Sequence, residues 1–226
     1  MIIDIMTLFP EMCEAFLSDS IIGRARKKNI LDIKCHQIRN FAYDKHKRVD
    51  DTPYGGGKGM LMMAEPIYQC FQNICEERKT RPLVVYMSPK GELLTQEKVK
   101  EFAGIENIAI LCGHYEGVDQ RLIDEIVDRQ ISIGDYVLTG GEIPAVAFVD
   151  AVSRLIPGVL SENVCFEEES HYDGLLEHPQ YTKPFNWRGK EVPQVLLSGH
   201  HANIKKWKKE SSVYETIKYR PDILNK

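Results

Sequence analysis

The sequence predicts an α/β protein with a mostly parallel sheet covered by helices on both faces, followed by a small, mostly helical domain. Short apolar runs rich in Ile, Val and Leu alternate with helical patterns up to about residue 156, and this alternation indicates βαβ units. With 226 residues, of which 43% are apolar, the chain is large enough to bury a core.

Five strands and four helices follow from these patterns. The helix expected at 64–79 has the clearest period, because Ile67, Cys70, Phe71 and Ile74 recur at i, i+3, i+4 and i+7. The strands are expected at 2–9, 31–38, 83–87, 107–112 and 131–138. The other helices are expected at 95–103, 119–129 and 142–156.

The alternation stops at Pro157, which we take as the end of an α/β domain of residues 1–157. Residues 158–174, "GVLSENVCFEEESHYDG", are acidic and without period, and we interpret them as a flexible linker. Residues 175–226 are dense in Pro and aromatics and then helical, which predicts a small basic domain.

Charge is distributed unevenly along the chain. The formal net charge is −4, but residues 180–226 hold ten Lys or Arg against four Asp or Glu, a balance of +6. Such a region is typical of a contact with a polyanion or of a solvated lysine-rich helix. We find no apolar run of about 18 residues and no signal peptide, so a cytoplasmic protein without a membrane partner is expected.

The six cysteines show no Cys-x-x-Cys spacing and the histidines no ligand spacing. Buried thiols are therefore favoured over zinc ligands or disulfides. The sequence contains no dedicated metal-ligand cluster, so any Mg²⁺ would be associated with RNA or held transiently.

Glycine clusters follow several of the strands. The stretch "DDTPYGGGKGM" at 50–60 fits neither a P-loop nor a dinucleotide fingerprint. Two interpretations remain open: a mobile surface turn, or a flexible loop that approaches a ligand. The stretches at 84–91, 112–121 and 131–144 end strands in glycines or turn residues with few cations nearby. Together they predict one pocket, lined by main chain, for a ligand with a ring system.

Six stretches in order resemble the TrmD family of bacterial tRNA (guanine-N1)-methyltransferases: "MIIDIMTLFPEM", "DDTPYGGGKGM", "CGHYEGVDQR", "ISIGDYVLTGGE", "DGLLEHPQYTKP" and "LLSGHHANIKKW". The resemblance covers essentially the whole chain. It implies the SPOUT class, with a deep trefoil knot at the C-terminal side of the α/β domain. It also implies that S-adenosylmethionine is held at Tyr86, Gly113, Glu116, Ile133, Gly134, Asp135, Tyr136, Val137, Leu138, Gly140 and Gly141.

The implied reaction is attack by N1 of the guanine immediately 3′ of the anticodon of tRNA on the sulfonium methyl. The resemblance maps the arginine near the guanine oxygen onto Arg154 and the carboxylate base onto Glu169, where the family usually has aspartate. Glu168 is the lesser candidate. Two rival functions stay open: a SPOUT ribose 2′-O-methyltransferase, and a cofactor-binding RNA-binding module without catalysis.

The resemblance further implies an obligate homodimer with the active site at the interface, and tRNA rather than DNA as the nucleic-acid partner. It assigns reading of the neighbouring guanine to Asp50 and Gly59. The stem backbone would be bound by four lysines together with Trp207: Lys205, Lys206, Lys208 and Lys209.

Overall fold

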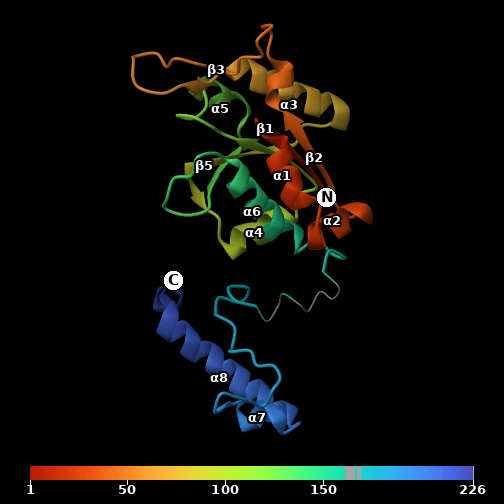
Figure 1. Cartoon of the computed structure of the whole chain (residues 1–226), viewed down its shortest axis with the longest axis vertical. Helices are drawn as coiled ribbons and strands as arrows, with labels where there is room; N and C mark the ends of the chain where they lie inside the picture. Colours follow the sequence, from red (N-terminus) through yellow and green to blue (C-terminus); the bar gives the residue numbers. More distant parts are fainter. Residues whose placement is uncertain (161–165, 167–168, 226) are drawn as a thin grey trace. The chain divides into compact units, whose positions relative to one another are not determined.

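The computed structural model of the chain describes residues 1–160, 166 and 169–225 (Figure 1). Two compact units make up the chain, Met1–Ser161 and Glu162–Lys226. Within the described ranges, no helix combines the length and the apolarity that crossing a membrane requires.

Unit 1 is built on a five-stranded sheet in the order β2-β1-β6-β5-β7, and every neighbouring pair is parallel. The strands are β1 (Ile2–Thr7), β2 (Asp32–Gln37), β5 (Leu83–Leu93), β6 (Asn107–Cys112) and β7 (Arg129–Ser132). The predicted α/β fold with a parallel sheet is thereby confirmed.

Helices cover both faces of this sheet (Figure 1). One face carries α1 (Pro10–Leu17), α2 (Ser20–Lys27), α4 (Gln96–Ala103) and α6 (Glu142–Ser153). The other carries α3 (Ala64–Arg78), α5 (Gln120–Ile126) and the short 3-10 helix η1 (Ile38–Phe41). Successive strand residues alternate between the two cores: Ile3 and Ile5 belong to the first and Met6 to the second.

The prediction of the last strand, 131–138, is wrong beyond Ser132. β7 ends there, and the expected continuation through 138 leaves the sheet as a loop. Gly134, with φ +155°, turns the chain, and the Ser132 hydroxyl accepts a hydrogen bond from the Gly134 N–H at 3.2 Å. Val137 in this loop is 81% exposed. The apolar residues of the loop therefore resemble a buried strand in the sequence although Val137 is not buried.

A two-stranded ribbon, β3 (Asp50–Asp51) with β4 (Leu61–Met62), carries the first glycine cluster. Gly55, Gly56, Gly57 and Gly59 in its loop all have positive φ, which side chains disfavour. The ribbon contacts the segment that follows β6, which the sequence predicts to line the pocket, because the Met62 N–H donates to the Gly117 carbonyl at 2.9 Å.

Unit 2 contains the hairpin β8 (Asn186–Trp187) and β9 (Lys190–Glu191), then α7 (Gln194–Leu197), α8 (His201–Tyr219) and η3 (Pro221–Asn225). The segment before the hairpin packs against α8 through a buried threonine. The Thr216 hydroxyl accepts from the Leu176 N–H at 2.9 Å and donates to the Ser212 carbonyl at 2.7 Å.

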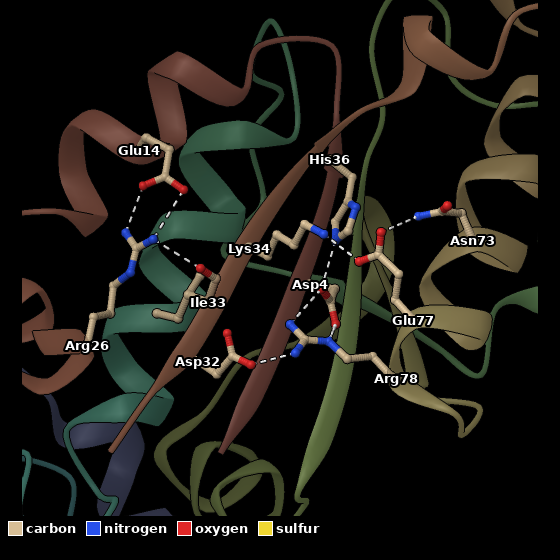
Figure 2. Close-up of polar contacts among 10 residues, drawn as sticks. All are labelled: Asp4, Glu14, Arg26, Asp32, Ile33, Lys34, His36, Asn73, Glu77 and Arg78. Carbon is tan, nitrogen blue, oxygen red and sulfur yellow. Dashed lines mark hydrogen bonds and ion pairs between the residues drawn. The ribbon is translucent and has the colours of Figure 1, made fainter. Parts of the chain in front are cut away.

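A buried charge cluster attaches α3 to the sheet (Figure 2). Asp4 on β1 is fully buried; His36 Nε2 lies 2.7 Å from its Oδ1, and Arg78 Nε donates to its Oδ2 at 2.9 Å. Burial alone would raise the pKa of Asp4, but the hydrogen bonds from His36 and Arg78 hold it below its usual value. Arg78 also pairs with the exposed Asp32, and Lys34 with Glu77.

We expect Asp4→Asn to cost about 3–5 kcal/mol of unfolding free energy, because it leaves the buried side of Arg78 without its counter-charge. Since folding lowers the Asp4 pKa, its contribution is present above the unfolded value of about 3.9 and is lost as pH falls through the folded pKa. Urea denaturation followed by far-UV circular dichroism at pH 7 and pH 3 measures both effects.

The matched control is Asp32→Asn, which removes the exposed partner of the same Arg78 and should cost at most about 1 kcal/mol. An equal loss in the two variants at pH 7 would contradict the assigned role of Asp4.

Candidate active site

A cavity of about 360 Å³ opens where three neighbouring strands of unit 1 stop pairing. Its lining comes from the middle of β5, where pairing with β7 is interrupted between Met87 and Glu92, and from the segments that follow β6 and β7. This is the carboxyl edge of a parallel sheet, where open α/β folds bind their ligands.

All of the predicted cofactor residues except Asp135 line this cavity. The structure thus brings three separate sequence segments together in one place. The members present are Tyr86, Gly113, Glu116, Ile133, Gly134, Tyr136, Val137, Leu138, Gly140 and Gly141.

Two of the glycines are required by close approach of the main chain. A Cβ on Gly141 would lie 2.7 Å from the Cα of Cys112 and 2.9 Å from the backbone nitrogen of Gly113. The Gly141 N–H donates to the Gly113 carbonyl at 2.9 Å, and Gly140 forms an antiparallel bridge with His114. The segments after β6 and before α6 therefore run in contact along their backbones.

A buried carboxylate holds these two segments in place. Glu142, at the first position of α6, is 2% exposed; its Oε1 accepts from the Thr7 hydroxyl at 2.7 Å, and its Oε2 lies 3.4 Å from His114 Nε2. No motif in the sequence predicts a role for Thr7, His114 or Glu142. The position of Glu142 directly after Gly140 and Gly141 is the one local signal, since a helix N-terminus favours a carboxylate.

The lining is mostly neutral and partly apolar. Burial raises the pKa of the Tyr86 phenol, so this side chain is uncharged at neutral pH. Lys90 adds one cation to the lining, and no motif in the sequence predicts this position for it. Among the residues that the structure describes, no three His, Cys, Asp or Glu side chains are arranged to hold a metal ion.

The two predicted guanine-reading residues lie in different surroundings. A Cβ on Gly59 would meet the Glu116 side chain, so the ribbon loop lies directly against the cavity lining. Asp50 lines a second cavity of about 160 Å³, which it shares with Tyr43, Arg48 and Glu65. Arg48 there pairs with Asp44 at 2.5 Å, and the Tyr43 hydroxyl donates to Glu65 at 3.0 Å.

The predicted catalytic pair is not part of this lining. Arg154 follows the last residue of α6, whereas Gly141 precedes its first, so a twelve-residue helix of about 18 Å separates them. Glu169 is half-buried in unit 2, where its N–H donates to the Phe166 carbonyl at 3.3 Å. Glu168 lies outside the described residues.

The predicted backbone-binding lysines all lie on α8. Lys205, Lys206 and Lys209 are exposed and Lys208 is half-buried. Positions three and four apart share a helix face, so Lys205 is a neighbour of both Lys208 and Lys209.

The sequence profile of the family described as "tRNA (Guanine-1)-methyltransferase TrmD" matches residues 1–226. The chain belongs to this family. The resemblance stated from the six motifs is thereby confirmed, and the chain is an enzyme of the TrmD type.

Similar TrmD-family proteins named "tRNA (guanine-N(1)-)-methyltransferase" cover nearly the whole chain. The protein of Ruminiclostridium cellulolyticum is 54% identical over 223 residues, which is 99% of this chain and 96% of that protein. That of Lachnospira eligens is 52% identical over 219 residues, 97% of this chain and 93% of that protein. That of Alkaliphilus oremlandii is 54% identical over 229 residues, with 99% and 92% covered.

We expect Gly141→Ala to destabilise unit 1 by about 1–3 kcal/mol, because the added carbon meets backbone atoms that cannot rotate away. Gly104→Ala is the matched control: its Cβ would meet the Glu101 carbonyl oxygen at 3.4 Å, and a change within about 0.5 kcal/mol is expected. Equal midpoints of urea denaturation for the two variants would refute the close approach.

Proposed function

We propose that this chain transfers the methyl group of S-adenosylmethionine to N1 of the guanine immediately 3′ of the anticodon in tRNA. The observation that carries the proposal is the cavity of about 360 Å³ that is lined by the middle of β5 and by the segments after β6 and β7. Membership of the TrmD family supplies the reaction class.

The residues of the cavity fit S-adenosylmethionine. Ile133, Tyr136 and Leu138 of the lining offer apolar surface to a flat adenine ring. The Glu116 carboxylate can accept hydrogen bonds from ribose hydroxyls. Lys90 supplies a positive charge for the methionine carboxylate. The contact of residues 140–141 with 112–113 supports a deep trefoil knot of the SPOUT class in this part of unit 1.

When bound, the cofactor supplies an electrophilic methyl group on a sulfonium. The work left to the protein is to position the guanine and remove its N1 proton. In our proposal the Glu169 carboxylate takes that proton and the Arg154 guanidinium stabilises negative charge developing on the guanine oxygen. Glutamate and aspartate differ by one methylene group and roughly a few tenths of a pKa unit, so the exchange preserves the chemistry.

A homodimer would explain why Arg154 lies a helix length away from the cavity of its own chain. In a homodimer, each Arg154 can serve the cavity of the partner. Unit 1 also exposes an apolar stripe at helical spacing on and beside α1, where Phe9 and Met12 are about 40% exposed and Phe16 is 63% exposed. A stripe of this kind is suited to burial against a second copy.

The tRNA would be bound by both units. Asp50 and Gly59 of the ribbon would read the neighbouring guanine, and α8 would contact the backbone through Lys205, Lys206, Lys208 and Lys209. We propose the division 1–157, linker 158–174 and 175–226 for these roles, in the cytoplasm where tRNA is modified. The linker includes 161–165 and 167–168, which lie outside the described residues.

The proposal is tested with labelled S-adenosylmethionine and an unmodified tRNA that carries consecutive guanines, followed by nucleoside analysis. N1-methylguanine is expected. A 2′-O-methylated product would indicate the ribose methyltransferase instead, and binding without product would indicate a non-catalytic module.

We expect Glu169→Gln to lower the single-turnover rate of methyl transfer by about 10²–10⁴-fold, because the amide cannot take the N1 proton. Cofactor affinity, measured by calorimetry, should stay unchanged. Glu169→Asp is the matched control, since it restores the residue usual in the family and should retain most of the rate. Normal turnover in Glu169→Gln would contradict the assignment.

We expect Lys209→Gln to weaken tRNA binding uniformly across tRNA sequences and to reduce the slope of log affinity against log salt by about 1. Filter binding at several salt concentrations measures both. An unchanged slope would show that Lys209 does not contact a phosphate.

A further inference from the structure

Ten consecutive residues of unit 2, 181–190 ("YTKPFNWRGK"), are all exposed. They hold three aromatic side chains and three cations and no Asp or Glu. The aromatics are Tyr181, Phe185 and Trp187, and the cations are Lys183, Arg188 and Lys190. Exposed aromatics that lie close together are typical of a surface that contacts a partner.

The second half of this stretch is a tight hairpin. β8 pairs with β9 through Trp187 and Lys190, and the Val192 N–H donates to the Phe185 carbonyl at 3.1 Å. Arg188 and Gly189 at the turn have φ +55° and +80°, as in a type I′ turn, and Asn186 Oδ1 accepts from the Gly189 N–H at 2.9 Å. The tip is therefore preformed.

An arginine is already stacked on the exposed tryptophan. The Arg188 guanidinium carbon lies 5.2 Å from the centre of the Trp187 ring, which is within the range of a cation–π contact. Trp187 is nevertheless 57% exposed. Trp207 differs, because it is half-buried, with ring centres of His178 and Tyr181 at 6.0 and 6.3 Å.

We propose that residues 185–191, which we call the Trp187 hairpin, form an RNA contact additional to α8. An unpaired base of the tRNA stacks on Trp187 beside Arg188, and Lys183 and Lys190 face the flanking phosphates. This inference rests on the proposed function, since it takes tRNA as the substrate, and it assigns that tRNA a second contact element.

The chemistry of the hairpin favours single-stranded RNA over a protein surface. Aromatic rings interleaved with Lys and Arg on a rigid support form the usual platform for unpaired bases, which stack on the ring while cations follow the backbone. Bases inside a duplex are already stacked and would not reach the ring. The acidic body of a second copy is the competing occupant, and the experiment distinguishes the two.

Trp187 can report on its own contact, because the chain has two tryptophans. In Trp207→Phe, the tryptophan fluorescence, excited at the red edge of the absorption band where tyrosine does not absorb, comes from Trp187 alone. We expect acrylamide to quench it readily in the RNA-free protein, and saturating tRNA to lower the emission and protect the ring from acrylamide. Protection before RNA is added would mean that a second copy covers the hairpin; an unchanged signal with bound tRNA would mean that no base stacks there. Either result overturns the proposal.

Affinity measurements in the chain that keeps Trp207 provide an independent test. Trp187→Ala should weaken tRNA binding by roughly 5- to 150-fold, the loss of one base stack, whereas Trp187→Phe keeps a ring and should lose much less. Arg188→Glu should weaken binding more than Arg188→Lys. Equal affinity of Trp187→Ala and the unaltered chain overturns the proposal.

Two controls separate this inference from the proposed function. Calorimetry with S-adenosylmethionine should give the same affinity in every hairpin variant, because the cavity belongs to unit 1. If the unaltered chain makes N1-methylguanine while Trp187→Ala binds tRNA normally, only the hairpin proposal fails. If the unaltered chain makes no N1-methylguanine, the proposed function fails.

Discussion

The close passage of residues 140–141 over residues 112–113 is the constraint on which the candidate site depends. A Cβ at Gly141 has no room against the Cys112 backbone, so the two segments can only meet as main chain. The same contact brings the segment after β6 next to the start of α6. The cavity consequently presents backbone groups and few charges, which suits a ligand with a ring and polar edges better than a row of phosphates.

Strand β1 connects this site to the opposite face of the sheet. Its two buried polar side chains lie on opposite sides: Asp4 binds Arg78 of α3, and Thr7 binds Glu142 of α6. Each buried carboxylate has hydrogen-bond partners, as burial of a charge requires. One central strand thus positions a helix on each face, and the helix beginning at Glu142 carries the glycine pair at its N-terminus.

The two units differ in charge in a way that fits their proposed roles. Residues 180–226 carry a balance of +6 within a chain of net charge −4, so the remainder is acidic. A neutral cavity in an acidic body is unsuited to holding RNA by itself, and a basic unit with exposed lysines and aromatics supplies that attraction. Arg154 lies a helix length from the cavity of its own chain. In the proposed mechanism a second copy is therefore needed, because its Arg154 serves this cavity.

The sequence by itself determined the α/β class, the parallel strands and the glycine-bearing strand ends that line the cavity. Apolar runs and a 3.6-residue period reflect burial that any packing of these elements must satisfy, and the glycine clusters mark strand ends in the linear chain. The six motifs determined the family. These signals depend only on neighbouring residues or on the order of motifs along the chain, so they can be recognised in the sequence alone.

Only the tertiary structure decided where strand 129–132 ends, because the apolar residues of 133–138 imitate a strand until their exposure is known. It also decided the partners of Asp4 and Glu142, since contacts across 74 and 135 residues leave no local pattern. The meeting of residues 140–141 with 112–113 has the same origin, because nearness in space at a sheet edge comes from strand order, which spacing along the chain does not encode.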